Sequence, residues 1–207
     1  MKGKFVTIEG CEGVGKSTQL RLIREEFAAA GREAVFTREP GGTPIAEQIR
    51  SIILDAGNSE MDGLTELLLY AAARRQHTEE KIRRALEEGK TVFCDRYVDS
   101  TLAYQGYARG MSKEVVRRLN ALAMGDVKID LTIFIDVPPE QGFLRKGGAD
   151  RSDRLEAETE DFHRLVYEGF CAIADEEPQR VARVRATGTK YETHEAIMKI
   201  LRERGII

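Results

Sequence analysis

One glycine-rich segment near the start of the chain constrains the fold more than any other feature. Residues 10–17 read G-C-E-G-V-G-K-S and match the pattern G-x4-G-K-[ST]. The preceding run, residues 5–9, is rich in β-branched and aromatic residues, and residues 16–30 carry apolar side chains at helical spacing. A strand, such a turn and a helix in that order form a P-loop, which holds phosphate groups with main-chain N–H groups and the positive end of the helix dipole.

Two side chains of this segment have specific expected roles. We expect Lys16 to reach the β- and γ-phosphates of a nucleotide as a catalytic residue, and the Ser17 hydroxyl to bind Mg²⁺. The residues expected to bind the phosphates of ATP are Gly10, Cys11, Glu12, Gly13, Val14, Gly15, Lys16, Ser17 and Thr18.

Strand patterns alternate with helix patterns along the rest of the chain. The expected strands are residues 5–9, 34–37, 91–94, 131–135 and 181–186. The expected helices are residues 16–30, a segment opening at Thr43 or Pro44, 64–86, 112–124, a segment opening at Pro138, 155–175 and 193–204. The helix that opens at Thr43 or Pro44 places four isoleucines on one face, namely Ile45, Ile49, Ile52 and Ile53. The alternation predicts an α/β fold in three layers, with a five-stranded parallel sheet and helices on both faces.

Length and composition limit the class of protein. A chain of 207 residues corresponds to about one domain, so we expect a single domain over residues 1–207. The net charge of -3 and the pI of about 5.8 argue against a general nucleic-acid-binding protein. The three cysteines, Cys11, Cys94 and Cys171, have no spacing typical of a disulfide framework or a zinc site. No apolar run approaches the ~20 residues of a membrane span, and we expect a cytoplasmic protein.

The chain lacks the motifs of two large P-loop classes. Neither N-K-x-D nor D-x-x-G, which GTPases need, occurs in it. The expected strand 91–94 is followed by Asp95-Arg96-Tyr97 and not by the paired acids of motor ATPases. These observations favour the P-loop kinase fold and a kinase that acts on a small anion.

Three arginines are expected to meet beside the P-loop. Arg38 directly follows the expected strand 34–37, Arg96 follows Asp95 at the end of the expected strand 91–94, and Arg74 lies on the long helix before that strand. Ligands of such folds bind beyond the carboxyl ends of the strands. Because arginine grips phosphate with two hydrogen bonds, the cluster suggests that the acceptor is itself a phosphate.

A phosphate acceptor changes what the enzyme must supply. Its second pKa is near ~6, so its oxygen is mostly ionised at neutral pH and needs no strong general base. The chain agrees, because none of its three histidines falls at an expected strand end. We expect structural or surface roles for His77, His163 and His194.

Five segments together resemble the bacterial thymidylate kinases. They are residues 10–18, T-R-E-P-G-G-T at 37–43, residues 70–74, D-R-Y at 95–97 and A-Y-Q-G at 103–106. They occur in order over nearly the whole chain. The resemblance implies transfer of the ATP γ-phosphoryl group to thymidine 5′-monophosphate, with Mg²⁺, in a homodimer that packs helices together.

The resemblance also implies roles for individual acceptor-site residues. Glu12 would bond the sugar 3′-hydroxyl, Tyr70 would stack on thymine, Arg74 would reach a base carbonyl, and Tyr104 would disfavour a 2′-hydroxyl. The full set implied for the substrate is Glu12, Arg38, Glu39, Pro40, Arg50, Tyr70, Arg74, Arg96, Thr101, Tyr104 and Gln105. Arg96 also counts as catalytic, and Asp95 would help position Mg²⁺.

A glycine-rich, basic segment at about 145–154 is expected to form a mobile lid. Some relatives carry a catalytic arginine in the P-loop, where this chain has Gly13. The resemblance therefore assigns transition-state charge to a lid arginine, Arg151 first and Arg145 next. We also expect the turn 186–188 near the adenine.

Two other functions remain open at this point. One is a kinase for another nucleoside or nucleotide, such as a uridine or cytidine nucleotide. The other is a non-catalytic P-loop protein that holds nucleotide without turning it over.

Overall fold

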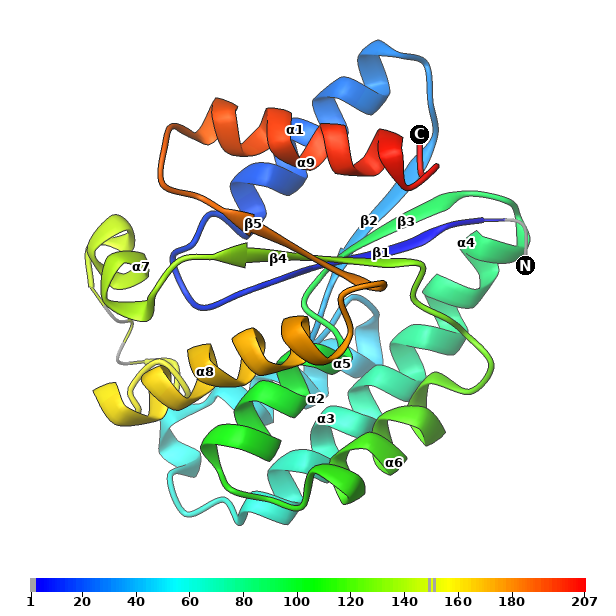
Figure 1. Ribbon diagram of the computed structural model, residues 1–207. Coiled ribbons are helices and arrows are strands. Elements are labelled where there is room, and N and C mark those ends of the chain that lie inside the picture. The colour runs from blue at the N-terminus through cyan, green and yellow to red at the C-terminus, as the bar shows by residue number, and fades with distance from the viewer. Residues whose placement is uncertain (1–2, 149, 151) are drawn as a thin grey trace.

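The computed structural model describes residues 3–148, 150 and 152–207 of the chain. Its sheet contains β1 (Phe5–Glu9), β2 (Ala34–Arg38), β3 (Thr91–Asp95), β4 (Leu131–Asp136) and β5 (Val181–Arg185), as Figure 1 shows. All pairings are parallel and the strand order is β2-β3-β1-β4-β5. The predicted five-stranded parallel sheet is confirmed.

Helices cover both faces of this sheet. In Figure 1, α1 (Lys16–Ala29) and α9 (Lys190–Glu203) lie on one face, and most of the other helices lie on the opposite face. Every residue of β1 and β4 is buried, as expected for central strands covered on both sides. The other helices are α2 (Pro44–Leu54), α3 (Gly63–His77), α4 (Arg83–Glu87), α5 (Val98–Thr101), α6 (Lys113–Met124), α7 (Pro139–Lys146) and α8 (Glu160–Glu176).

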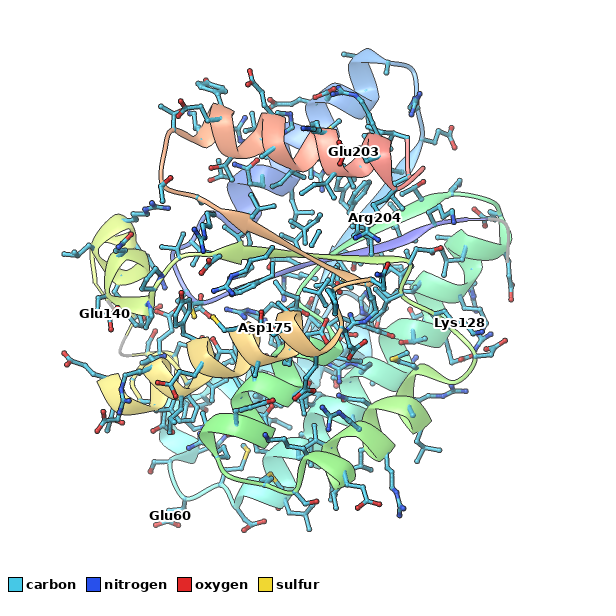
Figure 2. The ribbon with its side chains drawn as sticks, viewed as in Figure 1. Glu60, Lys128, Glu140, Asp175, Glu203 and Arg204 are labelled. Carbon is cyan, nitrogen blue, oxygen red and sulfur yellow. The ribbon has the colours of Figure 1, made fainter. Side chains whose placement is uncertain are left out.

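Polar side chains fix several helix starts. Asp62 accepts main-chain N–H groups at the start of α3, and Ser112 and Thr159 do the same for α6 and α8. Thr189 forms a capping box with Glu192 at the start of α9. Figure 2 shows side chains filling the space between the layers, while charged residues such as Glu60 and Glu140 lie at the periphery and are exposed.

Two segments differ from the sequence expectation. A helical segment was not predicted after β3, yet α5 continues into a π-helical stretch, Leu102–Ala108. Every residue from Thr101 to Gly106 is buried, so no amphipathic pattern marks it. The expected helix 155–175 begins too early: residues 154–157 form turns and α8 starts at Glu160. Asp153 accepts the N–H groups of Leu155 and Glu156 and holds these turns.

The apolar face expected on α2 is only partly used in the chain's own core. Ile53 is fully buried with Ala46, whereas Ile45 and Ile52 are about half exposed. The isoleucine stripe therefore extends beyond the contact that α2 makes with its neighbours.

The register aligns the carboxyl ends of β1, β2 and β3 at one edge. Arg38 pairs with Asp95 across β2 and β3, and Ile8 pairs with Asp95 across β1 and β3. The segment after β1 opens at the same edge, so the glycine-rich turn and these polar ends lie together. Within the described residues, no helix is long and apolar enough to cross a membrane.

Candidate functional site

A cavity of about 450 Å³ lies at the carboxyl ends of the strands. This volume falls in the range of small-molecule sites. The predicted site residues that line it are Glu12, Gly13, Gly15, Lys16, Ser17, Thr18, Arg38, Glu39, Pro40, Arg50, Tyr70, Arg74, Asp95, Arg96, Thr101, Tyr104 and Gln105. One cavity thus joins the glycine-rich turn to the acceptor residues.

Four predicted residues lie elsewhere in the described structure. Cys11 and Val14 are buried in the core behind the turn, and Gly10 lies at its start without lining the cavity. Arg145 lies on the last turn of α7 and donates to the carbonyl oxygen of Ala186 at 2.7 Å. Arg151 lies outside the described residues.

The glycine-rich turn is shaped by its glycines and by α7. Gly15 has φ +103° directly before α1, a conformation that favours glycine. A Cβ on Gly13 would overlap the carbonyl oxygen of Gly142 on α7, and a Cβ on Gly142 would overlap that of Glu12. The main chains of the turn and α7 therefore touch, and position 13 has no room for an arginine.

Lys16 closes the turn on itself. Its Nζ donates to the carbonyl oxygens of Gly10 at 3.0 Å and Cys11 at 2.6 Å, and the side chain is buried. Burial and the neighbouring Arg96 lower the pKa of Lys16. The ammonium thus lies in an anion-binding turn with only carbonyl oxygens as partners, and phosphate oxygens are stronger acceptors.

Ser17 and Asp95 present oxygen atoms beside Lys16. The Ser17 hydroxyl donates to Oδ2 of Asp95 at 3.1 Å. Oδ1 of Asp95 is buried without a protein partner. A hydroxyl, a carboxylate and phosphate oxygens are the hard donors that Mg²⁺ prefers. Among the described residues no group of three or more His, Cys, Asp or Glu could hold a metal ion. The Ser17 hydroxyl and the Asp95 carboxylate are oxygen donors that fit Mg²⁺ together with phosphate oxygens.

Arg96 lies at the centre of the site in a strained conformation. Its φ is +66°, which is uncommon for a residue other than glycine. The guanidinium donates to the Gly10 carbonyl at 2.9 Å, to Ser100 at 3.0 Å and to Glu12 at 2.5 Å. These contacts hold a cation at the mouth of the glycine-rich turn.

Glu12 is the carboxylate partner of this arginine. Burial alone would raise the pKa of Glu12, but the charges of Arg96 and Lys16 outweigh burial and lower the pKa to about 2. Glu12 is therefore ionised at neutral pH and can only accept hydrogen bonds. A ligand hydroxyl is the kind of group that such a carboxylate binds.

Glu9 is a site residue that the sequence reasoning missed. It is fully buried and accepts from the main-chain N–H of Tyr97 at 2.7 Å and from Ser100 at 2.6 Å. Tyr97 follows Arg96 in the chain and Ser100 accepts from the Arg96 guanidinium at 3.0 Å, so Glu9 supports the strained conformation of Arg96. Burial, followed by the charge of Asp99, raises the pKa of Glu9 to about 7. As the last residue of an apolar strand, Glu9 gave no signal of this role.

Arg74 is the most deeply buried cation of the cavity wall, with its side chain 1% exposed. It donates to Glu39 at 2.8 Å, to Asn120 at 2.6 Å, and to Thr101 at 2.8 Å; a fourth bond at 3.0 Å reaches the Tyr97 carbonyl. Four of its five N–H donors are thus used, which leaves one for a ligand.

The loop between β2 and α2 carries two further cations. Arg38 and Arg50 both donate to the carbonyl oxygen of Pro40, at 2.8 and 2.9 Å. Arg38 also pairs with Glu47 at 2.9 Å. Burial and the adjacent Arg38 lower the pKa of Arg50. Two like charges on one carbonyl oxygen form a site for an anion.

The end of the cavity away from the glycine-rich turn is lined by aromatic side chains and an amide side chain. Tyr70 and Tyr104 line it, and burial raises the pKa of both phenols, so each stays neutral. Thr101 accepts from Arg74, and Gln105 donates to Glu66 at 2.8 Å. Oε1 of Gln105 is buried without a protein partner.

The segment expected as a lid has a different structure at each end. Lys146, still on α7, pairs with the buried Glu156, and Glu156 also accepts from the N–H of Asp150 at 2.8 Å. Arg154 is buried and pairs with Glu66 at 2.5 Å. The second end is therefore anchored in the core, and its arginine faces away from solvent.

Seven other residues line the cavity, of which Lys146 and Asp153 belong to the segment expected as a lid; the seven are Leu54, Tyr97, Ser100, Lys146, Asp153, Leu155 and Glu156. One motif offered a signal, because Tyr97 belongs to D-R-Y at 95–97 and Ser100 lies three residues after it. The histidines behave as expected where their contacts are seen: His77 bridges Thr37 and Glu39 in the interior, and His194 bonds Glu26 at 3.0 Å.

The arrangement is suited to phosphate chemistry. Positive charge along one wall comes from Lys16, Arg96, Arg38 and Arg50. The other end is closed by groups that suit a planar base, namely Tyr70 and Gln105. No histidine of the described residues lines the cavity. Positioning and charge neutralisation are what this geometry can supply.

Comparison with known proteins places the chain among related sequences. The family model described as thymidylate kinase matches residues 8–197. The thymidylate kinase of Geobacter sulfurreducens is 46% identical over 208 residues, covering 98% of each chain, and that of Bacillus pumilus is 44% identical over 205 residues, covering 98% of this chain and 97% of the relative. The crystal structure of thymidylate kinase from Ehrlichia chaffeensis matches with a TM-score of 0.79 at 33% identity, over 98% of this chain and 99% of that chain.

Proposed function

The chain belongs to the thymidylate kinase family, and from that premise we propose that it phosphorylates thymidine 5′-monophosphate to the diphosphate with ATP, for dTTP synthesis. The observation that carries the proposal is the single cavity in which a P-loop and an arginine-rich, base-sized pocket meet. A kinase of nucleotides needs both phosphate groups in one enclosure.

Each end of the cavity has its own part in the reaction. Lys16 exchanges its carbonyl partners for the phosphates of ATP, and Arg38, Arg50 and Arg96 hold the acceptor phosphate. The acceptor oxygen is already mostly ionised near neutral pH, since its second pKa is about 6. The residues therefore align two anions and offset their repulsion, and none has to remove a proton.

Ser17 and Asp95 are the residues that would hold Mg²⁺ with ATP. The metal, when bound, neutralises charge on the transferring phosphate oxygens. The unpartnered Oδ1 of Asp95 supports this assignment.

The acceptor nucleotide is read by groups at the far end. Glu12, ionised and acceptor-only, suits the 3′-hydroxyl. Tyr104, a neutral phenol in the cavity wall, would crowd a 2′-hydroxyl and so favour deoxyribose. Tyr70 suits stacking on the base, while the spare donor of Arg74 suits a base carbonyl. Thr101 shapes this edge by accepting from Arg74.

Arg145 suits a place at the adenine and Arg151 remains the proposed transition-state cation. The bond from Arg145 to the Ala186 carbonyl brings its guanidinium to the end of β5, outside the cavity. The overlap at Gly13 supports a lid cation as well, because a P-loop arginine has no room there. Closure of the segment 145–154 would bring that charge over the phosphates and expel water.

Exposed apolar side chains support a homodimer. They come from α2, α3 and α6, with α3 packed between the other two, and they are Ile45, Ile52, Leu64, Leu68, Val115 and Leu122. Exposed apolar side chains gathered on helices that pack against one another are candidates for an interaction surface. Sedimentation should show a dimer that Leu68→Glu dissociates, while Tyr191→Glu, on the exposed side of α9, should leave it intact.

Steady-state kinetics over a panel of nucleoside monophosphates test the main proposal. With ATP and Mg²⁺, thymidine 5′-monophosphate should have the highest kcat/KM, and Lys16→Met should abolish turnover while the fold persists. Equal or better turnover of ribonucleotides would favour another nucleotide kinase. Tight nucleotide binding with no diphosphate formed from any acceptor would favour the non-catalytic alternative.

A further inference from the structure

Glu66 on α3 is a buried carboxylate at which three separate elements meet. Its side chain is 1% exposed. Oε1 accepts from Nε2 of Gln105 at 2.8 Å and from Arg109 at 3.2 Å. Oε2 accepts from Arg154 at 2.5 Å and from Arg109 at 3.2 Å. Glu66 does not line the cavity, so any effect on a ligand must pass through one of these partners.

The two arginines keep this carboxylate charged. Burial alone would raise the pKa of Glu66, but the hydrogen bonds from Arg109, Gln105 and Arg154 outweigh burial and lower the pKa. An ionised carboxylate has acceptors and no donor. Whatever touches its oxygens must present an N–H or O–H group.

This requirement fixes the amide of Gln105. A glutamine amide has a donor end and an acceptor end, and Glu66 can bind only the donor end. Oε1 must therefore point away from Glu66. It is buried without a protein partner, and Gln105 lines the cavity. A buried carbonyl oxygen in that position is satisfied only by a water molecule or by a ligand that donates a hydrogen bond.

We propose that Glu66 is a positioning residue for base selection, which holds Gln105 so that its carbonyl oxygen faces the acceptor base. The inference rests on the proposed function. Thymine carries a ring N3–H, which donates to that oxygen. Cytosine has an unprotonated N3 at the same position, so two acceptors would face each other. Glu66 thereby selects against cytosine without touching the nucleotide.

Glu66→Gln tests the orientation directly. The new amide can donate as well as accept, so Gln105 is free to turn and present its own N–H to the cavity. The ratio of kcat/KM for thymidine 5′-monophosphate over deoxycytidine 5′-monophosphate should fall by about 10-fold or more relative to the unaltered enzyme. In a Gln105→Leu background, the same substitution should produce no further change in the ratio.

Glu158→Gln is the matched control. It removes the other carboxylate of Arg109, which lies at 2.6 Å, and has no contact with Gln105. The ratio of kcat/KM for thymidine 5′-monophosphate over deoxycytidine 5′-monophosphate should be the same in Glu158→Gln as in the unaltered enzyme. If Glu66→Gln fails to fold, the double variant Glu66→Gln, Arg154→Met replaces it. Arg154→Met removes the guanidinium that Glu66→Gln would leave without a carboxylate, and the same fall in the kcat/KM ratio is expected.

The results separate this inference from the function on which it rests. A loss of activity in Glu66→Gln that is equal for both nucleotides, with the ratio unchanged, would reduce Glu66 to a structural residue and overturn the inference. An unaltered enzyme that fails to phosphorylate thymidine 5′-monophosphate would instead overturn the proposed function.

Discussion

The two ends of the cavity are built in different ways. At the acceptor end, Arg74 is 1% exposed and bonded to four groups of the protein. At the lid end, Lys146 is 37% exposed and its partner contact is one carboxylate, Glu156. Arg74 is therefore fixed before any ligand binds, whereas Lys146 is held by a single ion pair that solvent can reach.

This difference suggests that the acceptor end serves recognition and the lid end serves the chemical step. A base and a phosphate are recognised well by groups that need no rearrangement, because ordering them costs nothing at binding. Transition-state charge is better supplied by groups that arrive on closure and leave with the product. We therefore expect substitutions at the acceptor end to change stability and acceptor affinity together, and those at the lid end to change kinetics alone.

The strongest challenge to the comparison is Arg74→Met. The substitution leaves the buried Glu39 side chain with a single remaining partner, His77. It also removes the Arg74 hydrogen bonds to the side-chain oxygens of Asn120 and Thr101. Breaking a buried ion pair in this way should lower the free energy of unfolding by about 3–5 kcal/mol, measured by denaturant titration. Arg38→Met is the control, and its exposed pair should be worth less than about 1 kcal/mol. Similar losses in both variants would mean that the burial of the Arg74 pair adds nothing to stability, which would undermine the contrast between a fixed cation and an exposed one.

Gly142→Ala probes the junction between α7 and the P-loop. Its new Cβ would overlap the Glu12 carbonyl oxygen, so α7 must move or the turn must open. We expect a loss of about 1–3 kcal/mol in stability and a rise in the KM for ATP that exceeds the rise for the acceptor. Gly63→Ala, where a Cβ meets no atom within 4 Å and φ is not in the left-handed region, controls for the loss of a glycine as such. A larger rise in acceptor KM would place the damage at the other end.

The sequence predicted the two ends unequally, and the reason is physical. The P-loop and the arginines at strand ends follow from local patterns, because parallel strands end at one edge. Glu9 and Glu66 could not be found in this way: the first ends an apolar strand, and the second resembles an ordinary helix residue until tertiary contacts bury it. Ile45 and Ile52 read as core positions because periodicity identifies an apolar face without saying what covers it.

Arg145→Ala sharpens the comparison at the lid end. Its bond to the Ala186 carbonyl leaves it outside the cavity, so we expect the KM for ATP to rise by a few fold while kcat stays within about two-fold. Its stability should change by less than about 0.5 kcal/mol, as for most exposed positions. Arg151→Ala should instead lower kcat. If Arg145→Ala has the larger effect on kcat, Arg145 and not Arg151 supplies the transition-state charge.

A pH dependence of stability should separate two carboxylates beside the P-loop. Between pH ~4.5 and about 7 the folded chain holds a proton on Glu9 that the unfolded chain releases, so this group makes stability fall as pH rises, by at most about 1.4 kcal/mol per pH unit. Asp99 and Arg96 are the charges that face it. Glu9→Gln keeps both hydrogen bonds of Glu9, since Ser100 can accept as well as donate.

The stability of Glu9→Gln relative to the unaltered protein should therefore increase from pH 4.5 to 7 and then level off. Glu12→Gln should show the opposite pattern. The pKa of Glu12 is lowered to about 2, so its contribution is complete above pH ~4.5 and is lost as the pH falls from there towards 2. Unfolding free energies of the three proteins from pH 3 to 8 would decide this. Parallel curves for the two variants would mean that Glu9 and Glu12 share one environment, and the strained Arg96 between them would need another explanation.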